Sequence, residues 1–378
     1  MMTTGKLLYI SMSLENSNYG GSIVSRANLK ALKANKLLEV KEVAIVRKKE
    51  NTYAWELIAE NSKIQTALNN FRGFAGRLNP KIFNQIKGIV QDYQPAVVYL
   101  DSSLLGSIAE WCKETYPAIQ IVTFLHNIEV DFEKDRLKTG KIHYLPSLYS
   151  TSVAERKAVK YSNKLIVLHR VDSERLFQIY KRKADFCVPV CIVDTSISDE
   201  VLYSTDVRQK KPFIVGFIGT AFYANIDAAE YISQKIAPAF SNDSQVQFVI
   251  AGNGFESYAT KLGKPNVAMS GFVESLDDFY RNVDVILSPI SIGGGMKVKV
   301  AEALKYNKKI IASSFTLIGY EQSLDCPDII SCSTLDDYVV AIKKLCNTRF
   351  KASSSRTYFQ KYYSDQACTE YFKNIFNS

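Results

Sequence analysis

The sequence predicts an α/β protein with two domains, each built on a parallel β-sheet that helices cover on both faces. Short apolar runs rich in β-branched residues recur along the whole chain, and amphipathic stretches of helical length separate them. Strands that are buried on both faces read as continuous apolar runs, so this alternation favours parallel sheets. A chain of 378 residues is also long for a single hydrophobic core, which favours two domains.

The elements expected in the first half begin with a strand at the start of the chain, where the apolar stretch is too short for the core of a secretory signal. The expected strands are residues 7–12, 40–46, 96–100, 119–125 and 165–168, and the expected helices are 23–38, 81–93 and 103–116. In the second half the expected strands are 213–218, 246–251, 267–270, 283–288 and 310–312, and the expected helices are 227–240 and 335–346. Both halves therefore repeat the strand–helix alternation of a Rossmann-like sheet.

The two domains are expected to join near residue 200. Residues 189–212 are polar, lack a sustained period and end in a basic run, which is typical of a linker. We therefore expect an N-terminal domain over 1–195 and a C-terminal domain over 205–352, facing each other across a cleft where strand ends bind the ligand. A Tyr- and Phe-rich amphipathic pattern predicts a C-terminal helix, 355–378, that crosses back to the N-terminal domain.

Composition excludes several classes of protein. No run approaches the ~18 uninterrupted apolar residues of a membrane-spanning helix. The seven cysteines are scattered and form no CxxC pair, so we expect reduced thiols and a cytoplasmic location. No cluster has the spacing of zinc ligands and no Asp-x-Asp pair occurs, so no metal site is predicted.

The positive charge is unevenly distributed and favours an anionic partner. The formal net charge is +9, and residues 26–49 carry eight basic side chains against two glutamates. Such a balance suits a phosphorylated ligand or an anionic membrane. Together with the segment 71–81, FRGFAGRLNPK, it predicts peripheral contact with the inner face of a membrane, although an ordinary solvated surface remains an alternative. Nucleic acid is not an expected partner, because no nucleic-acid-binding motif accompanies the charge.

The segment 284–313, DVILSPISIGGGMKVKVAEALKYNKKIIAS, is the most informative part of the chain. An apolar run, the glycines Gly293, Gly294 and Gly295, a helical pattern and a second apolar run predict one βαβ unit with a ligand position at the end of its first strand. Glycines let the backbone approach an anion closely, and N–H groups at the helix start can bind it. Lys297 and Lys299 add positive charge, and the Glu302 carboxylate can accept hydrogen bonds from sugar hydroxyls. The pattern indicates a site for a phosphorylated sugar compound. A tight turn followed by a surface pair of Lys299 with Glu302 is the alternative.

Four motifs of the second half resemble, in order, those of the GT-B glycosyltransferases of family 4. They are GFIGTAFYANIDAAEYI (216–232), FVIAGNG (248–254), VAMSGFVESLDDFYRNVDVILSP (267–289) and GGGMKVKVAEALKYNKKIIAS (293–313). The last is similar to the GxGtrhKhhEA donor loop of one subfamily. In the first half, NYGGSIVSRANLKAL (18–32) is similar to the family's amino-terminal glycine loop, and TFLHNIE (123–129) to its H-N-x-E segment.

The resemblance implies a role for each matching residue. Glu302 would accept hydrogen bonds from the ribose, His126 would lie beside the reacting carbon, and Gly20 with Gly21 would form the N-domain loop near the donor phosphate or the acceptor. The implied donor-binding residues are Gly219, Thr220, Gly252, Phe272, Val273, Gly293, Gly294, Gly295, Met296, Lys297, Lys299 and Glu302. Phe272 and Val273 would hold the nucleobase, and Met296 belongs to the loop that touches phosphate and sugar.

Two departures from the family pattern change how the donor would be held. Gly294 stands where the first Glu of the Glu-x7-Glu motif is expected, and Ala221 and Asn225 stand where many members have a basic pair. The missing charge would then come from Lys297 or Lys299, and the sequence leaves both open.

The resemblance implies a retaining glycosyltransferase that moves a sugar from a nucleoside-diphosphate sugar to a glycan or a lipid-linked acceptor. It also implies a place in bacterial surface polysaccharide, lipopolysaccharide or capsule biosynthesis. No cofactor is expected, because the nucleotide sugar is the substrate and lysines with backbone N–H groups can neutralise the leaving group. Two alternatives stay open, namely a nucleotide-sugar epimerase on the same fold and a non-catalytic GT-B protein that binds a glycan or a partner.

Overall fold

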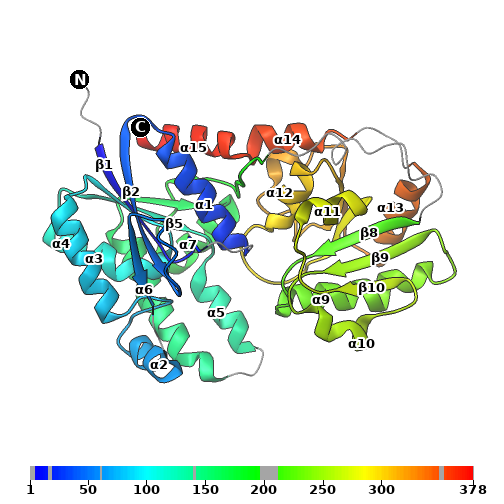
Figure 1. Ribbon diagram of the computed structural model, residues 1–378, viewed down its shortest axis with the longest axis horizontal. Coiled ribbons are helices and arrows are strands. Elements are labelled where there is room, and N and C mark those ends of the chain that lie inside the picture. Colours follow the sequence, from blue (N-terminus) through cyan, green and yellow to red (C-terminus); the bar gives the residue numbers. More distant parts are fainter. Residues whose placement is uncertain are drawn as a thin grey trace. The chain divides into compact units, whose positions relative to one another are not determined.

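The computed structural model describes residues 5–15, 19–59, 62–138, 142–195, 212–348 and 353–377. The described chain forms two compact units (Figure 1). The first contains Met1–Val193, Gly293–Gly295 and Asp365–Ser378, and the second contains Asp194–Ile292 and Met296–Ser364. Most of the expected linker, residues 196–211, lies outside the described residues.

The first unit is built on a parallel sheet in the strand order β3-β2-β1-β4-β5-β6-β7. Its strands are β1 (Gly5–Ser11), β2 (Leu38–Val46), β3 (Trp55–Ile58), β4 (Val97–Leu100), β5 (Gln120–Leu125), β6 (Lys164–Val167) and β7 (Phe186–Cys187). The strand order reverses between β1 and β4, whose register pairs Leu7 with Val97. The predicted parallel sheet is confirmed, and polar residues that follow β1, β4 and β5 come to one edge of it.

The helices of the first unit follow the strands in the expected alternation. They are α1 (Gly20–Lys33), α2 (Lys63–Phe71), α3 (Pro80–Tyr93), α4 (Gly106–Thr115), α5 (Glu129–Lys138), α6 (Leu145–Tyr161) and α7 (Arg170–Tyr180), with short 3-10 turns η1 (Ser103–Leu105) and η2 (Ile142–Tyr144). α3 shows how local sequence sets such a helix. Asn79 caps it by accepting the N–H of Ile82, Pro80 occupies its first turn, and Ile82, Ile86 and Val90 bury one face at helical spacing.

The second unit repeats the topology with six parallel strands in the order β10-β9-β8-β11-β12-β13. Its strands are β8 (Phe213–Ile218), β9 (Val246–Ala251), β10 (Val267–Ser270), β11 (Val285–Ser288), β12 (Lys309–Ser313) and β13 (Ile329–Cys332). Here the order reverses between β8 and β11, so the loops that follow these strands lie at the switch point where open α/β sheets bind ligands. The glycine-bearing segments of the sequence are these loops.

The helices of the second unit alternate with its strands. They are α9 (Tyr223–Tyr231), α10 (Ala259–Leu262), α11 (Leu276–Asn282), α12 (Val298–Lys305), α13 (Leu335–Asn347) and α14 (Ser355–Tyr362). A π-helical segment η3 (Ile232–Ile236) and the 3-10 turns η4 (Ala237–Phe240), η5 (Phe255–Tyr258) and η6 (Glu321–Ser323) complete the unit. The helix expected over 227–240 is therefore α9 continued by η3 and η4.

The C-terminal segment consists of two helices rather than the one expected over 355–378. α14 packs on α12 in the second unit, whereas α15 (Asp365–Asn377) belongs to the first unit and lies beside α1 (Figure 1). The ring of Phe372 meets Tyr99 edge-on at 5.9 Å, and Lys164 Nζ donates to the carbonyl of Ile375 at 2.7 Å. The apolar face of α15 thus returns to the first sheet, as the amphipathic pattern predicted.

Candidate functional site

The loops after β8 and β9 touch each other so closely that only glycine fits at one position. Gly219 donates its N–H to the carbonyl of Ala251 at 3.0 Å. Gly252 has a φ of +130°, and a Cβ added to it would lie 2.0 Å from the carbonyl oxygen of Gly219. The motifs that contain these two glycines, separate in sequence, therefore build one backbone surface at the ends of neighbouring strands.

Lys299 reaches this surface from α12. Its Nζ donates to Asn225 Oδ1 at 2.9 Å, and Asn225 Nδ2 donates to the carbonyl of Thr220 at 2.7 Å. The same ammonium lies 3.9 Å from the ring centroid of Phe217, and a Cβ on Gly219 would be 3.2 Å from Nζ. Lys299 is buried, and this burial lowers its pKa to about 7. An amine that is partly charged near neutral pH is thus held by an amide side chain beside the loop of Gly219 and Thr220.

Lys297 has a different environment. It is the N-cap residue of α12, and its Nζ lies 4.8 Å from the ring centroid of Phe315. Tyr320 secures this helix start, because its hydroxyl donates to the carbonyl of Lys297 at 2.9 Å and accepts the N–H of Ala301 at 3.2 Å. The two lysines that the sequence left open therefore differ in their surroundings: Lys299 lies against the β8 loop, and Lys297 lies beside Phe315.

Glu302 lies one turn beyond Lys299 on α12 and is partly buried. Tyr280 of α11 donates to its Oε2 at 3.3 Å, and burial raises the pKa of its carboxyl group. Lys299 bonds to Asn225 and Glu302 accepts from Tyr280. Lys299 is buried, so the surface pair of the alternative interpretation does not describe its surroundings, although the charges of Lys299 and Glu302 still act on each other.

The glycine run follows β11 in a braced loop. Gly293 and Gly295 have φ values of +103° and +62°, a left-handed backbone that favours glycine. Thr316 donates its hydroxyl to the carbonyl of Ser288 at 2.7 Å, which holds the end of β11. Gly293, Gly294 and Gly295 belong to the first compact unit. Met296 is buried and belongs to the second unit.

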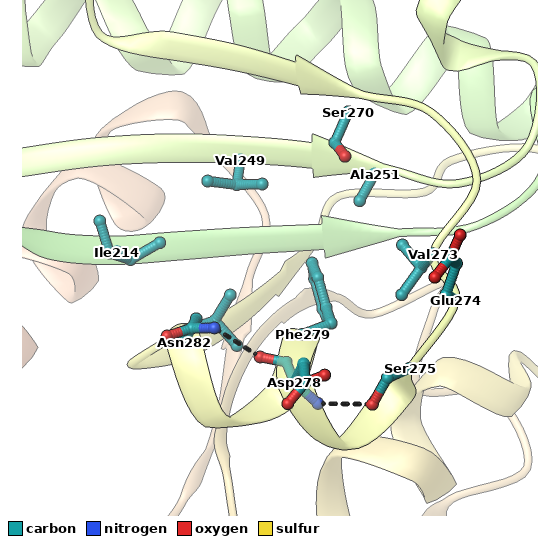
Figure 2. A pocket seen from close by; sticks show the side chains of 11 residues that line it. Ile214, Val249, Ala251, Ser270, Val273, Glu274, Ser275, Asp278, Phe279 and Asn282 are labelled. Carbon is teal, nitrogen blue, oxygen red and sulfur yellow. Dashed lines mark hydrogen bonds between the residues drawn. The ribbon is translucent and has the colours of Figure 1, made fainter.

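The two residues expected to hold a nucleobase differ in exposure. Phe272 has 64% of its surface exposed, whereas Val273 lines a pocket of about 380 Å³ between α11 and the strands β8, β9 and β10 (Figure 2). Ile214, Val249 and Phe279 form the apolar part of this pocket. Its lining residues are Ile214, Val249, Ala251, Ser270, Val273, Glu274, Ser275, Asp278, Phe279, Asn282 and Val283.

In the first unit, His126 is held by a chain of polar side chains at the sheet's switch point. His126 follows β5, and its Nε2 lies 3.2 Å from Asp101 Oδ1 and 3.1 Å from the carbonyl oxygen of Asp101. Ser11, the last residue of β1, donates to Asp101 Oδ2 at 2.7 Å. Burial alone would lower the pKa of His126, but the charge of Asp101 and its hydrogen bond outweigh it, so the pKa is raised.

Asp101 and Ser11 are functional candidates that sequence reasoning missed. Asp101 directly follows the apolar run of β4, as His126 follows β5. A polar residue at the end of each of two neighbouring strands was the available signal, because parallel strands end at the same edge.

The segment after His126 is anchored by a buried carboxylate. Glu155 of α6 accepts the N–H of Glu129 at 2.7 Å and the hydroxyl groups of Tyr180 and Ser103 at 2.9 and 3.0 Å. This network fixes the first turn of α5, and hence the end of the HNIE segment. Burial, followed by the charge of Glu155, raises the pKa of Glu129 to about 7.

Gly20 and Gly21 open α1, which follows β1. The N-cap residue, Tyr19, makes no capping hydrogen bond with its side chain, and the first turn of α1 contains no acidic residue. N–H groups at such a helix start favour an anion. The predicted N-domain loop is therefore the first turn of a helix rather than an open loop.

Comparison with known proteins gives a family-model match over part of the second unit and a fold. Residues 212–343 match the family model described as Glycosyl transferases group 1. No curated protein matches the chain.

Solved structures match both units together. HepE of Anabaena in complex with UDP superposes with a TM-score of 0.68 at 13% identity, covering 98% of this chain and 99% of HepE. TarM of S. aureus superposes with a TM-score of 0.69 at 10% identity, covering 100% of this chain and 99% of TarM. A glycosyltransferase of Rickettsia africae superposes with a TM-score of 0.64 at 12% identity, covering 99% of this chain and 98% of that protein. The fold is GT-B, as the motifs predicted.

Proposed function

We propose that this protein is a glycosyltransferase that moves a sugar from a nucleoside-diphosphate sugar to a glycan or lipid-linked acceptor, with retention of configuration. The observation that carries the proposal is Lys299, a buried lysine held by Asn225 beside the glycine-lined loops of β8 and β9. The family match of residues 212–343 supports the same chemistry. HepE, which shares the fold, has been solved with UDP and with UDP-glucose.

In this proposal the second unit binds the donor through charge and backbone. Lys299 neutralises the diphosphate, while Gly219, Thr220 and Gly252 let the backbone approach it closely. Glu302 accepts hydrogen bonds from the ribose hydroxyls, and Val273 with Phe272 borders the base. Lys299 takes the place of the basic pair that is missing at Ala221 and Asn225, because Asn225 holds its ammonium beside the β8 loop.

The first unit supplies the acceptor side. His126, with a raised pKa, would lie beside the reacting carbon and donate a hydrogen bond there, while Asp101 holds its ring. The departing diphosphate can take the proton of the acceptor hydroxyl, so the transfer proposed here uses no cofactor. The first turn of α1, with Gly20 and Gly21, would face an anionic group of donor or acceptor.

A lipid-linked acceptor would bring the enzyme to a membrane, and we propose a docking surface other than the basic stretch 26–49. Four basic side chains of that stretch are engaged within the protein: Arg26 with the carbonyl of Glu15, Lys30 with Asp365, Lys33 with Glu42 and Lys41 with the ring of Tyr93. Among the helices of the described residues, none is long and apolar enough to span a bilayer.

The helix α2 offers an exposed apolar face instead. Ile64, Leu68 and Phe71 are 76%, 51% and 65% exposed and lie on one side at helical spacing. Arg72 follows directly and is exposed. We propose that this face docks on the anionic inner leaflet of a membrane where surface polysaccharide precursors are assembled. Leu68→Gln with Phe71→Ser should reduce co-sedimentation with phosphatidylglycerol vesicles, whereas Val340→Ser, an exposed site on α13, should not. Equal binding by all three proteins would contradict this surface.

A donor screen tests the central proposal. A nucleoside diphosphate should raise the melting temperature of the protein, and a matching nucleotide sugar with an acceptor extract should release the diphosphate. Stabilisation without release would favour the non-catalytic binder, and a changed nucleotide sugar without acceptor would favour the epimerase. No stabilisation by UDP, GDP, ADP or CDP would refute the donor site.

A further inference from the structure

Two stacked tyrosines join α11 to α12 next to Glu302. The rings of Tyr280, on α11, and Tyr306, which follows α12, lie 4.2 Å apart with an angle of 7° between their planes. Both residues are buried. Stacking over this area fixes the two helices in register at the point where Glu302 projects.

The hydroxyl groups of the pair form crossed hydrogen bonds. Tyr280 donates from α11 to Glu302 Oε2 on α12 at 3.3 Å, and Tyr306 donates back to Asp277 Oδ1 on α11 at 2.5 Å. Within the described part of the chain, Tyr280 is the one donor that reaches the carboxylate of Glu302. Tyr306 makes the same kind of bond without touching Glu302, so the chain contains its own matched control.

This bond acts on both the charge and the orientation of Glu302. Burial raises the pKa of its carboxyl group, and the hydrogen bond from Tyr280 opposes that rise, as do the charges of Lys305 and Lys299 on the same helix. From neighbouring elements, Tyr280, Tyr306 and Tyr320 face this site, and burial, first of all, places the pKa of Tyr280 well above its usual value. Burial also raises the pKa of Tyr306, so Tyr280 and Tyr306 both stay protonated and Tyr280 remains a donor over the accessible pH range.

We propose that Tyr280 is a positioning residue that fixes one carboxylate oxygen of Glu302 and presents the other to the ribose hydroxyls, so that it sets the preference for ribonucleotide over deoxyribonucleotide donors. The inference rests on the proposed donor site. A carboxylate held by one fixed donor has its second oxygen pre-oriented, so less rotational freedom is lost when a sugar binds. Without Tyr280, Glu302 can rotate and is more easily protonated.

The test compares Tyr280→Phe, Tyr306→Phe and the unchanged protein by calorimetry with UDP, GDP and ADP and with the 2′-deoxy form of each, at pH 6 and pH 8. The unchanged protein should prefer the ribonucleotide. Tyr280→Phe should lower the affinity for the ribonucleotide about threefold to tenfold and should change the affinity for the deoxy form little. The ratio of ribonucleotide affinity to deoxyribonucleotide affinity should therefore fall. The loss should be larger at pH 6, because the less supported Glu302 takes up a proton more readily there than at pH 8. Tyr306→Phe should keep the ratio even if its melting temperature falls.

The outcomes separate this inference from the function on which it rests. Lys299→Met should weaken the ribo and deoxy forms equally, because it acts on the diphosphate. The positioning role would be overturned if Tyr280→Phe left the ratio of ribonucleotide to deoxyribonucleotide affinity unchanged, or if Tyr306→Phe lowered this ratio equally. Either result would leave the donor site intact. Failure of the unchanged protein to bind any of the nucleotides would overturn the donor site itself, and the inference with it.

Discussion

At the scale of single residues, Lys299 is the side chain whose protonation should control donor binding. Its pKa is lowered to about 7 by burial, so the free protein holds it partly neutral near neutral pH. A diphosphate favours the charged form and must therefore draw in a proton when it binds above pH 7. Affinity for UDP should fall by up to about tenfold per pH unit above pH 7.

Substitution of the two candidate lysines tests this assignment. Lys299→Met should abolish the thermal shift caused by UDP and remove its pH dependence, whereas Lys297→Met should retain most of both. Equal losses in the two variants would contradict the assignment. The linked effect on stability has a defined sign. Because the folded pKa lies below the ordinary 10.5, the unfolded chain binds more protons between these values, so the free-energy penalty for burying Lys299 shrinks and stability rises as pH increases through that window.

Asp101 should control the titration of His126. The carboxylate of Asp101, 3.2 Å from Nε2, is what raises the pKa of His126 against the effect of burial. Asp101→Asn should therefore lower that pKa, and proton NMR can follow it because the chain has only three histidines. His143, which is exposed, serves as the internal control. An unchanged His126 titration would show that the two side chains do not interact in solution.

At the scale of elements, the contact between the β8 and β9 loops depends on a missing side chain. Gly252→Ala puts a Cβ 2.0 Å from the carbonyl oxygen of Gly219 at a φ of +130°, so it should destabilise the fold by about 3 kcal/mol or more. Gly88→Ala is the matched control, because nothing lies within 4 Å of its added Cβ in α3, and it should stabilise by about 0.5–1 kcal/mol. Urea unfolding measures both, and a Gly252→Ala protein as stable as the parent would refute the contact.

Elements with strong local patterns were predictable and weak ones were not. The central strands of both sheets read as apolar runs because neighbours cover both of their faces. The edge strand β7 has two residues and β3 has four, too few to show a period. α5 was missed because charged residues dominate it and it carries little apolar stripe; Glu155 from α6 holds its start instead.

At the scale of the whole molecule, the C-terminal helix α15 joins the end of the chain to the first sheet. Phe372 of α15 is fully buried against Tyr99 of the first sheet, although the two are far apart in sequence. Phe372→Ala should cost about 3–5 kcal/mol of unfolding free energy through the cavity it leaves. Phe376→Ala, at a half-buried position on the same helix, should cost clearly less in the same denaturation experiment. Similar losses would show that α15 is not anchored through Phe372.

The sequence by itself determined the two parallel sheets, the order of the motifs and the positions where glycine is required, because apolar periodicity and backbone freedom are local properties. Tertiary structure decided which polar groups meet. Lys299 bonds to Asn225, 74 residues away, and His126 to Asp101, 25 residues away, since separate strands end at one sheet edge. Packing also gave the two lysines different surroundings. Lys299 is buried on α12 beside Asn225, whereas Lys297 is the half-buried N-cap residue beside Phe315, because only the fold sets which neighbours each side chain meets.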